Sequence, residues 1–379
     1  MMDIIKILSN LVSVETINPP GLNYPDMAES LRDLFSDVGL KMSLHEIPED
    51  YLDKNYIYSP SHRGRKRVVL VGRSGPDPKI HFNFHYDVVP AGDQWVSDPF
   101  SLRVSGDRAY GRGTADMKGA IVSLYLALSR VKDVSVEVSF VPDEESGGVG
   151  SRFLANELHL NPKYMIFGEP SFPNIFIGHF GILRGLIRVK GKQVHASMAS
   201  TGQNAFLEAS RFALRLQDEY SRLFQSAKEG QRPEINLGGY TIGGNSDSLV
   251  PGLFSFSFYR TTPPGDRENE NVDREIVDRI AKEMGVSYDF EIRSFVPGQR
   301  TSLDSKLVKI TESCVRKELS FEPSKSVALI RYDAVFFPSS EAVNIGPGEP
   351  DQAHIPNESV SIKNIEKTSK IYECIIESF

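Results

Sequence analysis

Three short strand-like segments in the first half of the chain are followed by side chains of the types that bind metal ions. The segments are residues 80–84, 134–140 and 164–167, and the side chains that follow them are His85 and Asp87, Glu144 and Glu145, and Glu169. Their length and their branched or aromatic composition indicate buried strands, and helical patterns such as that of residues 118–131 lie between them. In open α/β sheets, ligands and catalytic groups gather outside the carboxyl ends of the strands. The sequence therefore predicts an α/β fold with a polar site at that edge of the sheet.

The middle of the chain has the pattern of a separate α+β domain. Strands are indicated at residues 182–189, 240–242, 254–259 and near Phe290, and helices at residues 204–216 and 271–284. From residue 303 the alternation of helices and strands resumes. A single α+β layer of roughly 110 residues is consistent with an inserted domain. We therefore expect a catalytic domain of residues 1–181 and 295–379, interrupted by an inserted domain of residues 182–294.

The composition argues against several classes of partner. The 379 residues carry a formal net charge of −7, with acidic and basic residues mixed along the chain, so we expect no binding of nucleic acid or of an anionic membrane. No run of about 18 apolar residues occurs, so we expect no membrane span. The two cysteines, Cys314 and Cys374, indicate no disulfide framework and fit a reducing compartment. A cytoplasmic protein is therefore expected.

The set of histidines and acids is that of a two-metal hydrolase. Its members, in chain order, are His85, Asp116, Glu144, Glu145, Glu169 and His354. Two metal ions about 3.5–4 Å apart need one carboxylate that binds both, and Asp116, in a turn before a predicted helix, is the candidate. We expect His85 and Glu169 to complete one site, and Glu145 and His354 the other. Mixed imidazole and carboxylate ligands favour zinc, with cobalt or manganese as alternatives, over calcium or magnesium.

Two further acids have expected roles in catalysis. Asp87 lies two residues after His85, where its carboxylate is expected to accept the second ring N–H and fix the tautomer. Glu144 is the acid left over beside Glu145, and a carboxylate facing the bridging water would act as general base and pass the proton to the leaving amine. His81 precedes His85 in the same predicted strand and matches no motif, so we expect it to be structural.

These segments resemble those of the co-catalytic zinc amidohydrolases and peptidases, a family that includes succinyl-diaminopimelate desuccinylase, acetylornithine deacetylase and bacterial glutamate carboxypeptidase. The matching segments are residues 85–90, 111–119, 143–145, 168–171, 346–348 and 353–354, in the family's order. The resemblance implies a zinc exopeptidase-like catalytic domain with a mixed central sheet flanked by helices. It also implies an inserted lid that forms a homodimer, and often a cis peptide after the bridging aspartate.

The resemblance further implies substrate-binding groups in the inserted domain. His195, in the segment 191–196, matches a histidine that stabilises the oxyanion, commonly in the partner subunit's site. Arg260 matches an arginine that binds the substrate carboxylate. Where many members read Asn-Val-Ile-Pro, residues 248–251 read Ser-Leu-Val-Pro, so the asparagine contact is lost or moved to Asn245. Residues 331–336 also depart from the family pattern, so the substrate is not copied from any one member.

Several functions remain open at this stage. The favoured reading is a hydrolase that cleaves the amide bond of an N-acyl amino acid, of the desuccinylase or deacetylase type. The alternative is a metallo-carboxypeptidase or dipeptidase that acts on short peptides. A non-catalytic relative would be expected to lose the base or the bridging ligand, yet Glu144 and Asp116 are both present. A two-metal phosphoesterase on another fold fits the ligand types but not the order of the segments.

Overall fold

The chain forms two compact units. The computed structural model describes residues 2–132, 135–225, 227, 232–265 and 270–379. Unit 1 consists of Met1–Gly178, Thr301–Ser326 and Tyr332–Phe379, and unit 2 of His179–Arg300 and Val327–Arg331. The predicted borders after residues 181 and 294 lie a few residues from these divisions. The return of the chain to unit 2 at Val327–Arg331 has no counterpart in the prediction.

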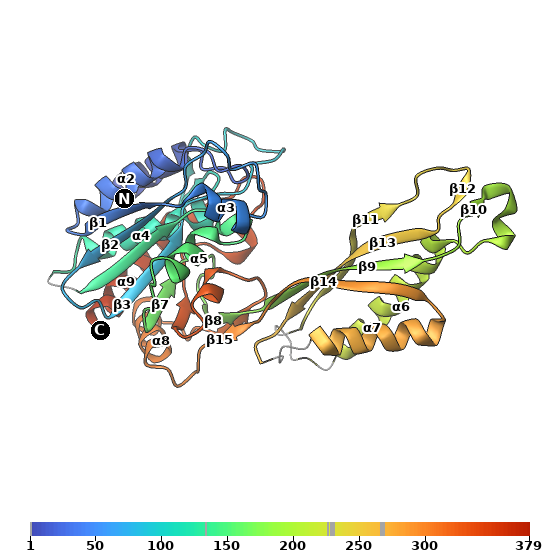
Figure 1. Ribbon diagram of the computed structural model, residues 1–379. Helices are drawn as coiled ribbons and strands as arrows, with labels where there is room; N and C mark the ends of the chain where they lie inside the picture. The colour runs from blue at the N-terminus through green and yellow to red at the C-terminus, as the bar shows by residue number, and fades with distance from the viewer. Residues whose placement is uncertain (1, 133–134, 226, 228–231, 266–269) are drawn as a thin grey trace. The chain divides into compact units, whose positions relative to one another are not determined.

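Unit 1 is built on a mixed sheet in which β1, β2, β6, β3, β7, β17 and β8 follow one another (Figure 1). These strands are β1 (Lys41–Glu46), β2 (Val68–Ser74), β3 (Ile80–His85), β6 (Val136–Val141), β7 (Tyr164–Phe167), β8 (Ile175–His179) and β17 (Glu341–Asn344). β3 runs parallel to β6 and β7, and β17 runs parallel to β7, whereas β1, β2 and β8 are antiparallel to their neighbours. The three predicted strands are thus confirmed as β3, β6 and β7, except that Val134 lies outside the described residues.

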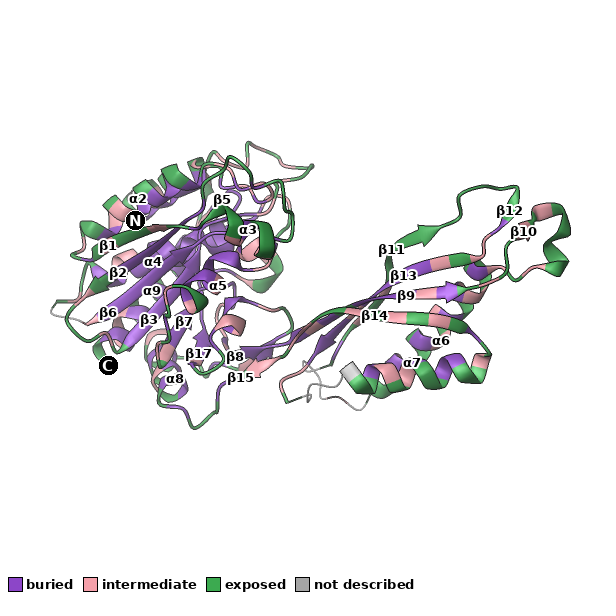
Figure 2. Ribbon diagram, viewed as in Figure 1, coloured by how far each residue is buried: buried purple, intermediate pink, exposed green. Residues whose placement is uncertain are grey.

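Helices flank this sheet, which confirms the predicted fold class (Figure 1). They are α1 (Met2–Ser13), α2 (Tyr24–Ser36), α3 (Glu49–Asn55), α4 (Gly119–Leu128), α5 (Val149–Asn156), α8 (Lys306–Leu319) and α9 (Ile362–Glu377). α4 is apolar on nearly every side because it is covered by α1, α9 and the sheet. Figure 2 shows the inner strands of the sheet buried, whereas the edge strand β1 and the outer faces of helices such as α2 are largely exposed. A packed sheet of this kind holds the turns at its strand ends in fixed positions.

Several short elements carry the turns beside the sheet. β4 (Arg103–Ser105), β5 (Arg108–Tyr110) and β18 (Ser359–Ser361) form a small antiparallel sheet that joins the last part of the chain to the segment before α4. The short helical turns of unit 1 are η1 (Thr114–Lys118), η2 (Glu144–Ser146), η4 (Asp333–Phe336) and η5 (Pro350–Gln352). β16 (Lys325–Ala328) begins in unit 1 and ends in unit 2.

Unit 2 is a four-stranded antiparallel sheet with two helices, as the α+β pattern of this region predicts. Its sheet order is β11 (Ile235–Gly243), β13 (Leu253–Thr262), β9 (Gly181–Lys190) and β14 (Ser287–Val296). α6 (Ala205–Phe224) and α7 (Glu270–Met284) pack on this sheet, and the remaining elements are β10 (Val194–His195), η3 (Ala196–Thr201), β12 (Leu249–Val250) and β15 (Gln299–Arg300). Phe256 and Phe258 of β13 point into the core that the helices cover. The unit therefore has a hydrophobic core of its own.

The structure corrects the expectation that the cysteines are unpaired. Cys314 of α8 and Cys374 of α9 form a disulfide with an S–S distance of 2.07 Å. Their separation of 60 residues carries no signal in the sequence, and only the packing of α8 on α9 brings them together. The expected reducing compartment loses this support, because disulfides are rare in most cytosolic proteins. Across the described part of the chain, none of the helices combines the length and apolar character needed to span a bilayer.

Candidate metal centre

Side chains from separate turns of unit 1 converge at the carboxyl edge of the sheet. His85 is the last residue of β3, Glu145 lies in η2 just after β6, and Glu169 follows β7. Asp116 lies in η1, between β5 and α4, and His354 follows η5. Because β6, β3 and β7 are parallel neighbours, their carboxyl ends carry His85, Glu145 and Glu169 to one place.

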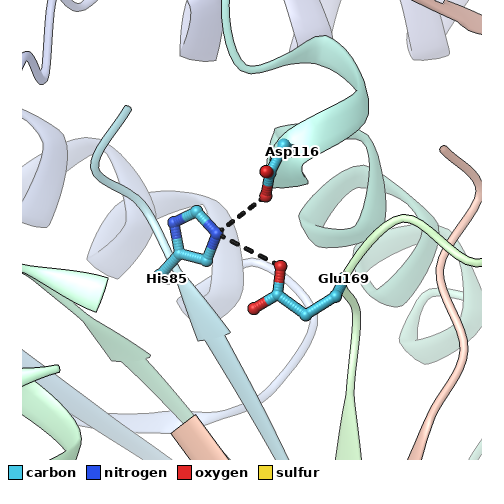
Figure 3. A group of neighbouring side chains, drawn as sticks. All are labelled: His85, Asp116 and Glu169. Carbon is cyan, nitrogen blue, oxygen red and sulfur yellow. Dashed lines mark hydrogen bonds and ion pairs between the residues drawn. The ribbon is translucent and has the colours of Figure 1, made fainter. Parts of the chain in front are cut away.

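The first group of ligand atoms is buried and consists of His85, Asp116 and Glu169. Nε2 of His85 lies 3.0 Å from Oδ1 of Asp116 and 3.6 Å from Oε2 of Glu169 (Figure 3). In Figure 3 the three side chains point toward one another from separate segments. The ligand atoms all lie within 4.8 Å of one another, close enough for one ion to contact all three.

The second group consists of Asp116, Glu145 and His354. Nε2 of His354 lies 3.4 Å from Oδ2 of Asp116 and 3.0 Å from Oε1 of Glu145. Asp116 therefore faces His85 with one carboxylate oxygen and His354 with the other. The peptide bond after Asp116 is cis, as the resemblance implies. One carboxylate shared by two groups of donors is the arrangement required of a bridging ligand.

The charges in this cluster fit a pair of cations. Burial raises the pKa of Glu169 to about 8 and that of Glu145 to about 7, and the negative charge of Asp116 adds to both shifts. Burial also acts to raise the pKa of Asp116, but hydrogen bonding to His354 and His85 lowers it below its usual value. Carboxylates held this close without positive charge repel one another, and divalent ions with oxygen and imidazole ligands relieve that repulsion. The described residues thus fit two divalent ions.

Asp87 orients its neighbours differently from the prediction. Nδ1 of His85 hydrogen-bonds the main-chain oxygen of Asp87 at 3.0 Å, while the nearer carboxylate oxygen lies 3.6 Å away, too far for a hydrogen bond. The carboxylate instead accepts the backbone N–H groups of Glu144 (3.2 Å) and Glu145 (3.3 Å). The turn that carries Glu144 and Glu145 offers these unpaired N–H groups, and they bind the charge more closely than the ring does. Asp87 therefore joins the His85 ligand to the turn of the expected base.

Glu144 lies beside the first group of ligands. Burial, followed by the charges of Glu169 and Asp333, raises the pKa of Glu144 well above its ordinary value. A carboxyl with a raised pKa holds a proton more readily than an exposed one does. The general-base role of Glu144 stays a prediction that this environment permits.

A buried polar network behind this turn was not identified from the sequence. Asp143 is fully buried and accepts hydrogen bonds from Asn18 (3.1 Å), Tyr24 (3.0 Å) and Arg67 (3.3 Å). Asn18 also donates to the carboxylate of Asp87 at 2.9 Å. The network anchors both ends of the contact between Asp87 and the Glu144 turn. Its only sequence signal was the place of Asp143 next to Glu144, because the other members come from distant segments with no motif.

The expected substrate-binding residues all belong to unit 2, whereas the candidate metal ligands all belong to unit 1. His195 is exposed at the end of β10, and its Nδ1 accepts the N–H of Ser197 at 3.2 Å. Asn245 is exposed between β11 and β12. Arg260 is buried, and its guanidinium contacts the carboxylate of Asp273 at 2.7 Å. The structure thus gives Arg260 a carboxylate partner from its own chain, where the prediction expected a carboxylate from the substrate.

The chain is similar to known proteins over nearly its whole length. A model of Peptidase family M20/M25/M40 matches residues 81–378. A succinyl-diaminopimelate desuccinylase from a Nitratiruptor species is 26% identical, and the alignment covers 100% of both chains. An acetylornithine deacetylase from Klebsiella pneumoniae is also 26% identical over 99% of this chain and 97% of the relative.

Solved structures share the whole fold. The metallo-carboxypeptidase Sso-CP2 from Sulfolobus solfataricus superposes with a TM-score of 0.74 at 19% identity, covering 100% of this chain and 99% of that one. The YXEP protein of Bacillus subtilis, described as a dinuclear metal-binding peptidase, has a TM-score of 0.66 at 13% identity and covers 100% and 99%. At these identities the likeness establishes the fold.

Proposed function

The chain belongs to Peptidase family M20/M25/M40, and on this premise we propose that it hydrolyses the amide bond of an N-acyl amino acid by means of two divalent metal ions. One observation carries the proposal. Oδ1 of Asp116 lies 3.0 Å from Nε2 of His85, and Oδ2 lies 3.4 Å from Nε2 of His354. A single carboxylate shared by two three-residue groups is what a two-ion centre needs, and a lone ion would leave one group without positive charge.

Zinc is the proposed metal. Each group combines one imidazole with two carboxylates, and ligands of this kind suit zinc, with cobalt and manganese as replacements. Bound ions would supply Lewis acidity to the substrate carbonyl and to a water molecule. The YXEP protein, which shares the fold, is described as binding two metals.

The residues of this chain would move the proton. Glu144 is held by the hydrogen bond from its backbone N–H to Asp87, and burial raises the pKa of its carboxyl well above the ordinary value, so the group holds a proton more readily than an exposed carboxylate does. Glu144 takes the proton of the attacking water and delivers it to the nitrogen of the leaving amine. Glu145 is not proposed as the base, because its carboxylate lies 3.0 Å from Nε2 of His354 and belongs to the second group of candidate ligands.

Unit 2 would complete the site in a homodimer. Because Nδ1 of His195 accepts the N–H of Ser197, its Nε2 carries the proton and is able to donate to the oxyanion of a partner subunit's site. Asn245 is exposed and would contact the substrate. To bind the substrate carboxylate, Arg260 would have to release the carboxylate of Asp273.

The proposal specifies the type of bond that is cleaved, and the relatives indicate which acyl group and amine it joins. The relatives named as a desuccinylase and a deacetylase cover the chain from end to end and support an N-acyl amino acid as substrate. The carboxypeptidase with a TM-score of 0.74 supports the alternative, the C-terminal bond of a short peptide. Retention of both Asp116 and Glu144 argues against a non-catalytic relative.

A metal-dependent hydrolysis panel tests the proposal. The full chain is stripped with a chelator, reloaded with zinc, cobalt or manganese, and offered N-acetylornithine, N-succinyl-diaminopimelate, other N-acyl amino acids and dipeptides. Glu144→Gln should keep both metal ions and lower kcat by about 10²–10⁴-fold. Glu144→Asp, which keeps the charge but retracts the carboxylate, should retain part of the activity. Native rates in Glu144→Gln, or failure of the native chain to bind two ions, would refute the proposal.

A further inference from the structure

The carboxylate of Glu358 is buried against the turn that carries Asp116. Glu358 is fully buried and lies directly before β18. Oε1 accepts the backbone N–H groups of Ala115 (2.8 Å) and Asp116 (3.1 Å). Oε2 accepts the N–H of Gly113 (2.9 Å) and Nη1 of Arg112 (2.8 Å). All four donors belong to one segment of five residues, so both carboxylate oxygens bind that segment.

This turn needs an external acceptor. Asp116 and Met117 have non-helical backbone angles inside η1, so the N–H groups before them lack the partners that a regular helix would supply. Several N–H groups that converge in a turn form a concave site for an anion. A carboxylate offers two acceptor oxygens and no donor, which matches two pairs of donors. A glutamine of the same shape would turn an NH2 group toward one of these pairs.

Glu358 also joins the Asp116 turn to the His354 segment. It lies four residues after His354, and its main-chain oxygen accepts the N–H of Gly111 at 3.0 Å. Arg112, its ion-pair partner, also donates to the main-chain oxygens of Ile355 (3.3 Å) and Ala91 (3.1 Å). The ion pair is nearly inaccessible to solvent, so water competes little for these contacts.

We propose that Glu358 is a positioning residue of the metal centre, whose buried carboxylate holds the Asp116 turn against the His354 segment and so sets the metal affinity of the second group. Asp116 and His354 are both members of that group, and Glu358 contacts the segments of both. His85 and Glu169 of the first group are held instead at the ends of neighbouring strands. The inference rests on the proposed metal centre and is independent of the substrate.

A purely structural role for Glu358 is the competing explanation, and the same segment offers a control. Glu349, five residues before His354, accepts hydrogen bonds from Arg108 (2.9 Å) and Asn364 (3.1 Å). Among the described residues, its recorded hydrogen bonds do not reach the Asp116 turn. Glu349→Gln therefore makes the same chemical change as Glu358→Gln in the neighbouring part of the chain and leaves the hydrogen bonds of the Asp116 turn in place.

The experiment titrates the chelator-stripped full chain with zinc alone and follows both binding steps by calorimetry. In Glu358→Gln, the affinity of the second group for zinc should fall by about 10–100-fold, and that of the first group by less, because His85 and Glu169 keep their places at strand ends. Excess zinc should restore kcat with KM unchanged. Glu349→Gln should bind both ions as the native chain does, whatever its melting temperature.

The outcomes separate the two proposals. A native chain that binds no zinc refutes the metal centre itself. A native chain with two sites, and a folded Glu358→Gln that binds both ions with native affinity, overturns only the inference about Glu358. Equal weakening in Glu349→Gln overturns it as well. If Glu358→Gln does not fold, Glu358→Asp decides, because it keeps the charge beside Arg112 yet cannot reach both pairs of donors; an unchanged second affinity there would refute the inference.

Discussion

The two halves of the metal centre share Asp116 but differ in how they are built and how far they open to solvent. The side chains of His85 and Glu169 are 1% and 9% exposed, whereas that of His354 is 52% exposed. His85 and Glu169 stand at the ends of paired strands, β3 and β7. The side chain of Glu145, in the second group, is also buried and lies in η2 just after β6, whereas His354 lies 209 residues further along the chain, in the loop after η5. A ligand at a strand end takes its position from the sheet, while the position of His354 depends on hydrogen bonds to its loop, such as those of Glu358.

Removal of the shared ligand is expected to have the largest effect on this comparison. Asp116→Ala takes one oxygen from each group, so both ions should be lost and turnover should fall to the level of the metal-free protein. Metal content after dialysis and kcat with excess zinc provide the measurement. A variant that kept one ion at native affinity would show that the halves are independent sites.

Removal of one histidine at a time should separate the halves. His354→Ala is expected to release one ion and leave the other, because the buried group keeps all of its ligands. His85→Ala removes a ligand from the buried group and should weaken the tighter ion, since the buried site loses less to competing water. Competition with a graded series of chelators would measure both constants. Equal losses in the two variants would remove the distinction between the buried half and the open half.

A change of pH should have the smallest of these effects, and it should act on the stability of the metal-free protein. The folded chain keeps protons on Glu145 and Glu169 up to about pH 7 and 8, whereas unfolded glutamates release them near about pH 4.3. The raised pKa of His354, about 11, acts in the same direction. Because the folded state binds more protons, the free energy of unfolding should fall as the pH rises from about 5 to 8.

Melting curves at several pH values would test this dependence. Zinc-loaded protein should lack the decline, because metal ligands bind in their deprotonated form. Glu145→Gln should lessen the decline below about pH 7, and Glu169→Gln should lessen it up to about pH 8. A stripped protein whose melting temperature rose over this range would contradict the assignment of these carboxylates to one repulsive cluster.

The strand framework and its ligands could be predicted because they leave a local signal. Segments of strand length and composition precede His85 and Glu169, and the parallel pairing of these strands brings the two side chains together. His81, in contrast, lies inside β3 and not at its end. Its ring contacts Glu137 (2.8 Å) and Ser139 (2.7 Å) of β6, so it joins two strands of the sheet, in line with the structural role expected for it.

Contacts between distant segments could not be predicted, since they depend on side-chain placement and not on any period in the sequence. Glu358 and Asp116 are 242 residues apart, and the carboxylate of Asp87 binds two amides that no motif marks. The ion pair of Arg260 with Asp273 joins β13 to α7 in unit 2, and no motif marks it. The disulfide between Cys314 and Cys374 belongs to the same class of contact.

The position of β17 has a consequence for how the protein is made in the cell. β17 (Glu341–Asn344) fills the place between β7 and β8, which come from residues 164–179. While a ribosome is still translating the middle of the message, β7 therefore has an unpaired edge, and such an edge invites pairing with other nascent chains. His354 leaves the ribosome later still. Until residues 341–344 have been made, that edge stays open to such pairing, and the second group of candidate ligands is incomplete until His354 has been added.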